Sequence, residues 1–219
     1  MATATTETPK QAEAPAGPLR PTPIVPPSDE PRLYRMTTDI YEAMVKAGVF
    51  GDVSPIYLWK GQLVLPMTKG PDHENALAAL NALFVPLVGS ERHVRLGSPV
   101  RIPDDSEPEP DVLILRGTVR DFHKRTPGPA DVALAVEVAD SSLRFDSGSK
   151  MSAYAEAGIP EYWVVNIPRQ RVDVYSKPSG PGPSPSYADH RSCSPEEEIL
   201  LTLDGREVGR IAVRDILVG

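Results

Sequence analysis

One glutamate lies in a stretch of the sequence where an ionised carboxylate is out of place. Residues 132–139, VALAVEVA, are apolar at every position except Glu137, which is typical of a strand buried on both faces. Moving an unpartnered carboxylate from water into such surroundings costs several kcal/mol. We therefore expect Glu137 either to shift its pKa or to contact a cation, hydrogen-bond donors or a metal ion.

A lysine follows in the next predicted element. Asp146 is expected to cap a helix that ends at Gly158, so that Lys150 falls in its first turn. The expected inner face of this helix consists of Met151, Tyr154 and Ala155. A cation near a helix N-terminus opposes the macrodipole, and side chains lean toward that terminus. The Lys150 ammonium is thus predicted to point back toward Glu137; the alternative is a solvated lysine that pairs locally with Asp146.

A second carboxylate could complete a metal site. Asp111 precedes another short apolar run, VLIL at 112–115, so Asp111 and Glu137 are expected on adjacent strands. Hard cations such as Mg²⁺ bind carboxylate oxygens and keep several waters. A metal held by these two acids would bind a phosphate oxygen and activate a water, while Lys150 would orient that water or neutralise developing charge. The alternative is that Asp111 is only a turn or cap residue.

These residues need a sheet with helices on both faces to bring them together. The predicted order is helix, hairpin, helix, strands, helix, strands, which indicates a mixed α/β (α+β) domain with a central β-sheet flanked by helices. The first helix, residues 39–48, is expected to bury Ile40, Met44 and Val45. A hairpin turns at Lys60 and Gly61, and a second helix opens at Pro71 with His73 on its inner face.

Composition bounds the class of protein. Of the 219 residues, the Pro-, Ala- and Thr-rich stretch 1–33 is predicted to be a disordered tail that precedes a single domain at residues 34–219. Without a secretory signal or a long apolar span, the protein is expected to be soluble and cytoplasmic.

The single cysteine, Cys193, excludes a disulfide framework and is expected to be a surface thiol. The net charge of -7 argues against a protein whose whole surface binds nucleic acid, but it does not exclude a local basic cleft.

Several short motifs carry a family resemblance. They are Pro110-Asp111-Val112, AVEVADSS at 135–142, Asp146, Lys150, Tyr154 and GIPEYW at 158–163. This ordered set resembles the Uma-type putative restriction endonuclease family, a branch of the PD-(D/E)xK nuclease superfamily, and the similarity runs from about Met36 to the C-terminus. The resemblance implies a restriction endonuclease-like fold, a phosphodiesterase site that depends on Mg²⁺ or Mn²⁺, and DNA as the substrate.

The resemblance assigns roles residue by residue. Asp111 stands at the first acid and Glu137 at the second, both as metal ligands and catalytic residues. The superfamily's lysine position two residues after the second acid holds Ala139 here, and Lys150 matches the lysine that the family carries on the following helix. The resemblance therefore implies a catalytic set that departs from the usual ExK spacing.

Two neighbouring residues and the hairpin complete the comparison with the family. His73 matches a family histidine and is a catalytic candidate, with a half-buried structural histidine in the cap region, hydrogen-bonded to the sheet, as the alternative. Glu74 is a further candidate metal ligand or water-binding acid. The hairpin of the family reads like ELIDG, whereas this chain has YLWKG, so Tyr57 and Lys60 replace acidic residues.

Three functions remain open on the sequence. The leading one is an Mg²⁺-dependent endonuclease; the alternative is a catalytically silent nuclease-fold protein that binds nucleic acid or a protein partner. A third is a metal-dependent hydrolase that acts on another phosphodiester or on a nucleotide. Because cutting both strands of a duplex with one site per chain favours two-fold symmetry, a homodimer is expected for the first. Tyr162 and Trp163 are expected in the core, with stacking on bases as the alternative.

Overall fold

The computed structural model describes residues 33–51 and 55–217. Residues Tyr34–Gly219 form one compact unit. The predicted disordered tail, residues 1–33, lies outside the described residues apart from Leu33. In the part of the chain that is described, no helix combines the length and apolar character that crossing a bilayer requires.

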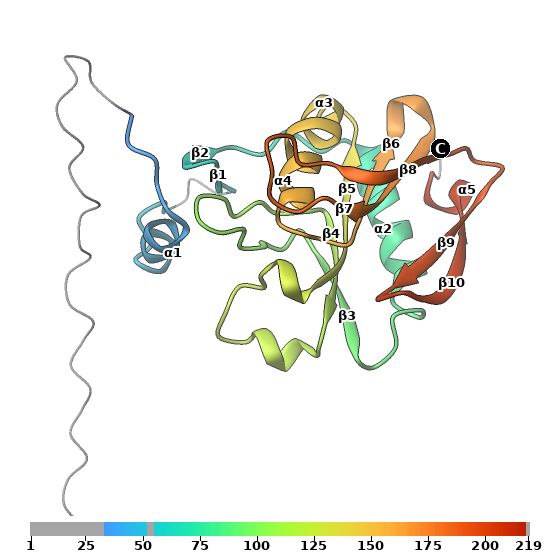
Figure 1. The fold of residues 1–219 in the computed structure, drawn as a ribbon, viewed down its shortest axis with the longest axis horizontal. Coiled ribbons are helices and arrows are strands. Elements are labelled where there is room, and N and C mark those ends of the chain that lie inside the picture. Colours follow the sequence, from blue (N-terminus) through green and yellow to red (C-terminus); the bar gives the residue numbers. More distant parts are fainter. Residues whose placement is uncertain (1–32, 52–54, 218–219) are drawn as a thin grey trace, which may run out of the picture. The chain divides into compact units, whose positions relative to one another are not determined.

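A six-stranded mixed sheet forms the core of this unit (Figure 1). The strands lie in the order β3-β4-β5-β6-β7-β8, with bounds β3 Arg92–Leu96, β4 Val112–Arg116, β5 Val132–Ala139, β6 Glu161–Asn166, β7 Arg171–Pro178 and β8 Tyr187–Cys193. Neighbouring strands are antiparallel except β5 and β6, which are parallel. A parallel pair needs a crossover connection, and here the crossover contains the helices that carry Lys150.

The remaining elements flank this sheet. The helices are α1 Thr38–Lys46, α2 Pro71–Phe84, α3 Leu143–Phe145, α4 Met151–Glu156 and α5 Val213–Ile216, with a π-helical turn Asp146–Lys150 between α3 and α4. Two antiparallel hairpins are formed by β1 Tyr57–Trp59 with β2 Gln62–Val64 and by β9 Glu198–Leu203 with β10 Arg206–Ala212. Short 3₁₀ turns occur at Val119–Phe122, Pro129–Asp131 and Ile167–Arg169. The hairpin at Lys60 and Gly61 and the helix that opens at Pro71 are therefore both present as predicted.

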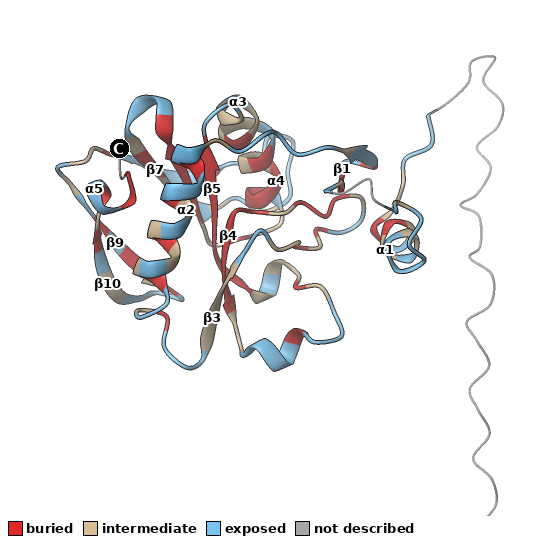
Figure 2. Ribbon diagram, turned by 180° about the vertical axis from the view of Figure 1, so that it is seen from behind, coloured by how far each residue is buried: buried red, intermediate tan, exposed pale blue. Residues whose placement is uncertain are grey.

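Apolar cores cover both faces of the sheet, and β5 is buried at every position (Figure 2). One core joins alternate residues of β5 to the inner side of α2, including Leu80 and Phe84, and to the second hairpin. The other joins the intervening residues to Tyr154 and Ala155 of α4. This arrangement confirms the predicted fold class, a central mixed sheet flanked by helices.

The buried side of α1 differs from the prediction. Val45 is 50% exposed, and the buried residues of the helix are Thr38 and Tyr41. The Tyr41 hydroxyl donates a hydrogen bond to the carbonyl of Ile56 at 2.8 Å. The helix therefore turns its aromatic residue toward the chain that enters β1, a tertiary contact that helical periodicity alone does not report.

Strand β8 was not predicted, and Cys193 is its last residue. Tyr187 and Cys193 at the two ends of the strand are buried, whereas the five residues between them, four of which are polar, are exposed. This polar edge strand lacks the apolar alternation that marks a strand in the sequence. The expectation of a surface thiol is wrong, because Cys193 is fully buried in the core beside α2.

Candidate active site

The helical segment after β5 begins earlier than predicted. Leu143 opens α3, so Asp146 lies inside the helical run rather than at its cap. The sequence DSGSK at 146–150 forms a π-helical turn, and the Ser147 hydroxyl donates to the carbonyl of Leu143 at 2.6 Å. Such turns recur at functional sites. Here the turn buries both Asp146 and Lys150.

Lys150 joins the two carboxylates that were its alternative partners. Its Nζ lies 2.9 Å from Glu137 Oε2 and 3.1 Å from Asp146 Oδ1. The second oxygen of Glu137, Oε1, accepts a hydrogen bond from the Tyr154 hydroxyl at 2.9 Å. Asp146 Oδ1 has no hydrogen bond, so its contact with Lys150 is an ion pair without hydrogen-bond geometry. The buried glutamate is thus met by a cation and a hydroxyl donor.

Burial and charge act in opposite directions on this pair. Burial raises the pKa of Glu137 to about 8, although Lys150 lowers it. Burial disfavours the charged ammonium of Lys150, but Glu137 and Asp146 outweigh that effect and raise its pKa. Lys150 is therefore held as a cation, and the carboxyl that it contacts is poised to change its charge when its surroundings change.

Asp111 is held from three directions. Its Oδ2 accepts a hydrogen bond from the backbone N–H of Val138 at 2.8 Å. Its Oδ1 lies 2.9 Å from Lys69 Nζ and 3.2 Å from His73 Nε2. Burial alone would raise the pKa of Asp111, but contacts with His73, Lys69 and Val138 lower it to about 2. Asp111 is therefore ionised and fixed in position.

Asp111 and Glu137 project to the same face of the sheet. Val112 of β4 pairs with Val136 of β5, so the two acids lie next to this pair at the same end of the ladder. Leu113 and Ala135, which are related to them by the two-residue period of a strand, both pack in the core beside α4. Both acids therefore face the side of the sheet from which Lys150 approaches.

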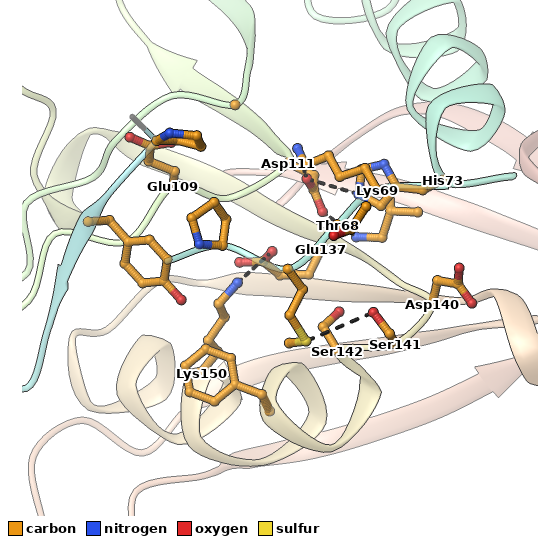
Figure 3. A pocket seen from close by; sticks show the side chains of 17 residues that line it. Thr68, Lys69, His73, Glu109, Asp111, Glu137, Asp140, Ser141, Ser142 and Lys150 are labelled. Atoms are coloured by element: carbon orange, nitrogen blue, oxygen red, sulfur yellow. Dashed lines mark hydrogen bonds and ion pairs between the residues drawn. The ribbon is translucent and has the colours of Figure 1, made fainter. Parts of the chain in front are cut away.

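A cavity of about 120 Å³ opens where these side chains meet (Figure 3). Four residues singled out in the sequence line it: Asp111, Glu137, Lys150 and His73. Glu74 is not among the lining residues; its side chain is 59% exposed, and its Oε1 lies 3.5 Å from His73 Nδ1. The structure thus brings four of the five candidates together and places Glu74 behind His73.

The hairpin residue that departs from the family pattern also lines the cavity. Tyr57 stands where the family pattern has an acid, and burial raises the pKa of its hydroxyl. Its phenol therefore supplies a neutral wall in place of a carboxylate. Lys60, the other departure, adopts a left-handed conformation with φ of 48° at the hairpin turn.

Two contacts of the site were not predicted from the sequence, that of Lys69 with Asp111 and that of Tyr154 with Glu137. A third, between Asp146 and Lys150, was expected only as the alternative to the pair with Glu137. The available signal for Lys69 was its position just before a helix N-terminus, where a cation is unfavourable. Tyr154 gave no signal, because a tyrosine on the inner face of a helix is usually a core residue.

The aromatic pair that follows α4 belongs to the core. Trp163 is fully buried and meets Phe84 edge-on, with ring centroids 5.7 Å apart. Tyr162 is also fully buried, and its hydroxyl donates to the backbone carbonyl of Asp146 at 3.0 Å. Neither ring is exposed for stacking on a base, so the alternative interpretation is wrong, and Tyr162 instead supports the π-helical turn.

The carboxylates of the cavity suit a hard divalent cation that needs few protein ligands. They do not suit a metal ion that is enclosed entirely by protein ligands. Among residues 33–51 and 55–217, no group of three or more His, Cys, Asp and Glu side chains is arranged to hold a metal ion. Mg²⁺, however, is usually bound by only one or two carboxylates together with waters and substrate phosphates. Asp111 and Glu137, which face one cavity, supply that number of ligands, so the donor set fits Mg²⁺.

Comparisons with known proteins bear on the fold and the family. The chain is similar to a solved structure, a putative nuclease belonging to DUF820 from Anabaena variabilis, with a TM-score of 0.57 and 11% sequence identity over 74% of this chain and 89% of that chain. At that identity the likeness supports the restriction endonuclease-like fold. No curated protein matches the chain. Residues 41–212 match the family described as "Uma2: Putative restriction endonuclease", and since the match covers well over half of the chain, the protein belongs to that family.

Proposed function

We propose that the protein is a metal-dependent endonuclease that hydrolyses phosphodiester bonds of DNA with Mg²⁺ or Mn²⁺. The observation that carries the proposal is the convergence of Asp111, Glu137 and Lys150 on one cavity, with the lysine 2.9 Å from the glutamate. Two carboxylates and a buried cation are the groups that metal-assisted phosphoryl chemistry needs. The family to which the chain belongs points to the same reaction class.

Asp111 and Glu137 are the residues that would hold the metal. A divalent ion bound there would polarise a phosphoryl oxygen and lower the pKa of a bound water. The backbone N–H of Val138 and the imidazole of His73 fix the orientation of Asp111, and the Tyr154 hydroxyl fixes that of Glu137. These contacts keep the two acids in place before substrate arrives, which is the condition for effective electrostatic catalysis.

Lys150 supplies the positive charge that belongs to the protein itself. Its ammonium lies between Glu137 and Asp146 and lines the cavity. From there it can donate a hydrogen bond to a phosphate oxygen on which negative charge develops, or orient the attacking water. Asp146 holds the ammonium from the far side and acts as a positioning residue.

The test is cleavage of supercoiled plasmid by the purified full-length chain. We expect nicked product with Mg²⁺ or Mn²⁺, none with EDTA, and a loss of at least about 10²-fold for Asp111→Asn. Asp189→Asn is the matched control, because Asp189 is 53% exposed and pairs with Lys177 on the far edge of the sheet. Equal nicking by Asp111→Asn and Asp189→Asn would contradict the assignment of the site.

One observation favours a second candidate, a silent nuclease-fold protein that binds DNA or a protein partner. Lys69 and Lys150 already neutralise the two proposed ligands. If the purified chain retains DNA in a gel-shift assay but never nicks it with either metal across duplex and single-stranded substrates, this candidate replaces the first.

A homodimer is part of the endonuclease proposal. Each chain contributes one such cavity, so cutting both strands of a duplex at one position calls for two copies related by a two-fold axis. Sedimentation of the chain with and without a DNA duplex would measure this directly. A protein that remains monomeric on DNA and only nicks it would limit the proposal to single-strand cleavage.

A further inference from the structure

Lys69 makes a contact that the proposed mechanism does not use. Its Nζ lies 2.9 Å from Asp111 Oδ1 (Figure 3), the same oxygen that His73 approaches at 3.2 Å. The other oxygen of Asp111 accepts from the backbone of Val138. Lys69 therefore occupies the side of the carboxylate that faces the cavity, where a metal ligand would need a free lone pair.

Local structure does not explain a lysine at this position. Lys69 directly precedes Gly70, the N-cap residue of α2, and that cap has no side-chain hydrogen bond. A cation beside a helix N-terminus opposes the helix dipole, so an acidic or neutral residue would suit the helix better. The contact that offsets this cost is the one with Asp111.

The charges of the cavity show what the lysine does there. Besides the buried Asp111, Glu137 and Asp146, the carboxyl groups of Glu109 and Asp140 line the cavity, and the ammonium groups there are those of Lys69 and Lys150. A divalent ion on Asp111 Oδ1 would lie beside the Lys69 ammonium, which is 2.9 Å from the same oxygen, and two cations that close repel each other. Exchange of Lys69 for the divalent ion removes this repulsion.

Lys69 can leave with little loss of buried surface. Its side chain is 41% exposed, whereas that of Lys150 is 10% exposed. It lies between β2 and α2 in residues 65–70, which form neither helix nor strand. Its neighbours Leu65 and Met67 are 65% and 46% exposed. The segment is thus weakly anchored, as expected for a part of the chain that moves on binding.

We propose that Lys69 is an exchangeable internal cation, which neutralises Asp111 in the metal-free protein and must release it before a divalent ion binds. This inference rests on the proposed function. Lys69 thereby sets the affinity of the site for metal, since part of the binding free energy is used to displace the ammonium. The ammonium of Lys150, by contrast, stays in place with its two buried carboxylates.

The test measures metal binding to the full chain without DNA, by titration with Mn²⁺ followed by its paramagnetic resonance signal. We expect Lys69→Met to tighten Mn²⁺ binding about three- to tenfold, a moderate change because the pair is partly exposed. Lys69→Arg keeps the cation and should restore affinity close to that of the unmodified chain. Lys124→Met is the charge control, because Lys124 lines a different cavity, and it should change the affinity by less than twofold.

The outcomes separate this inference from the proposed function. If the unmodified chain binds Mn²⁺, Asp111→Asn does not, and Lys69→Met binds no more tightly, the exchange is overturned while the metal site stands. Equal tightening by Lys69→Met and Lys124→Met would also overturn it, because the effect would then be one of net charge. If neither the unmodified chain nor Lys69→Met binds Mn²⁺, both the inference and the metal-dependent function fail.

Discussion

The two faces of β5 differ in what they bury. Toward α2 the strand presents Leu134, Val136 and Val138, which pack in an apolar core. Toward α4 it presents Glu137 between Ala135 and Ala139, and the glutamate is 2% exposed. The two sets alternate along one strand, so the same backbone supports both. Stability and chemistry are thus separated by the pleat of the strand rather than by position along the chain.

The difference has an energetic consequence. Each apolar side chain on the α2 side contributes roughly 1.5–3 kcal/mol by leaving water. On the α4 side the desolvation of the charged groups opposes folding, and Lys150 and Tyr154 compensate for it through their contacts with Glu137. Substitutions on the α2 side should therefore affect stability alone, whereas those on the α4 side should affect activity with stability effects of either sign.

The largest expected effect is that of Glu137→Gln on activity. The amide removes one proposed metal ligand, so plasmid nicking should fall by about 10³-fold or more and Mn²⁺ binding should be lost. Stability should be unchanged or higher, because burial disfavours the ionised carboxylate of this residue. Thermal unfolding and nicking assays measure the two effects, with the exposed Glu156→Gln as the control. Nicking that survives the substitution would mean that the chemistry lies elsewhere.

Lys150→Met should reduce activity next most strongly. Nicking should fall by about 10²-fold, since one charge contact to the transition state is lost. Unlike Glu137→Gln, this change should also destabilise the fold, because it leaves Glu137 and Asp146 buried without their cation. The opposite signs of the two stability effects would show that the lysine offsets the cost of the buried acids.

The destabilisation by Lys150→Met should depend on pH. The folded pKa of Glu137 lies above its ordinary value of 4.5, and loss of the lysine raises it further. Below pH 4.5 the carboxyl is protonated in both states and contributes no penalty; as pH rises, ionisation favours the unfolded chain. In the unmodified chain this loss of stability ends near the folded pKa of about 8, whereas in Lys150→Met it continues above that pH, so the difference in melting temperature should be larger at pH 9 than at pH 6. A difference that is equal at both values would argue against a buried carboxyl as its cause.

Val136→Ala tests the other face of the strand. Val136 is fully buried in the core beside α2, and its truncation should lower the free energy of unfolding by about 2 kcal/mol. Nicking per folded molecule should not change. Urea unfolding measures the first effect, with Val119→Ala, at a position that is 64% exposed, as the control. A large loss of activity in the folded Val136→Ala protein would break the proposed separation between the two faces.

The strand β5 and the buried position of Glu137 could be predicted from the sequence because both are recognised from a local pattern. An apolar run marks a strand buried on both sides, and one acid within it is visible without any tertiary information. The edge strand β8 has no such pattern. Its exposed residues, 188–192, are all polar except Ala188. The start of α3 was missed because Asp146 is a favourable N-cap residue, which placed the predicted helix start three residues too late, and the π-helical turn at 146–150 depends on packing.

The site shows the same division between local and tertiary information. Lys150 was found because an unfavourable cation beside a predicted helix end needs a reason. The same argument applied to Lys69, but its partner Asp111 lies 42 residues away in the sequence, and no periodicity links a loop to a strand end at that separation. Tyr154 carries two roles at once, since it packs in the core and donates to Glu137, and a pattern reports only the first of them.

Tyr154→Phe should have the smallest effect of these substitutions. It tests one contact on the α4 side of β5 without changing the packing there. The substitution keeps the ring in the core and removes only the hydroxyl that donates to Glu137 Oε1, so stability should fall by about 1 kcal/mol. Nicking should fall by roughly three- to tenfold, since the proposed metal ligand loses one of the contacts that orient it.

Tyr187→Phe is the matched control for that change. Its hydroxyl is also buried and donates at 2.9 Å, but to the backbone carbonyl of Ile159 rather than to a site residue. The two substitutions should therefore cost similar stability, while only Tyr154→Phe lowers activity. In the Glu137→Gln background Mn²⁺ binding should already be lost, so Tyr154→Phe should not change it further. The effect of Tyr154→Phe on stability should differ from its effect in the unmodified chain, because the two residues share one hydrogen bond. Equal activity losses in both tyrosine variants would mean that general loosening of the α4 side, rather than the orientation of Glu137, limits the reaction.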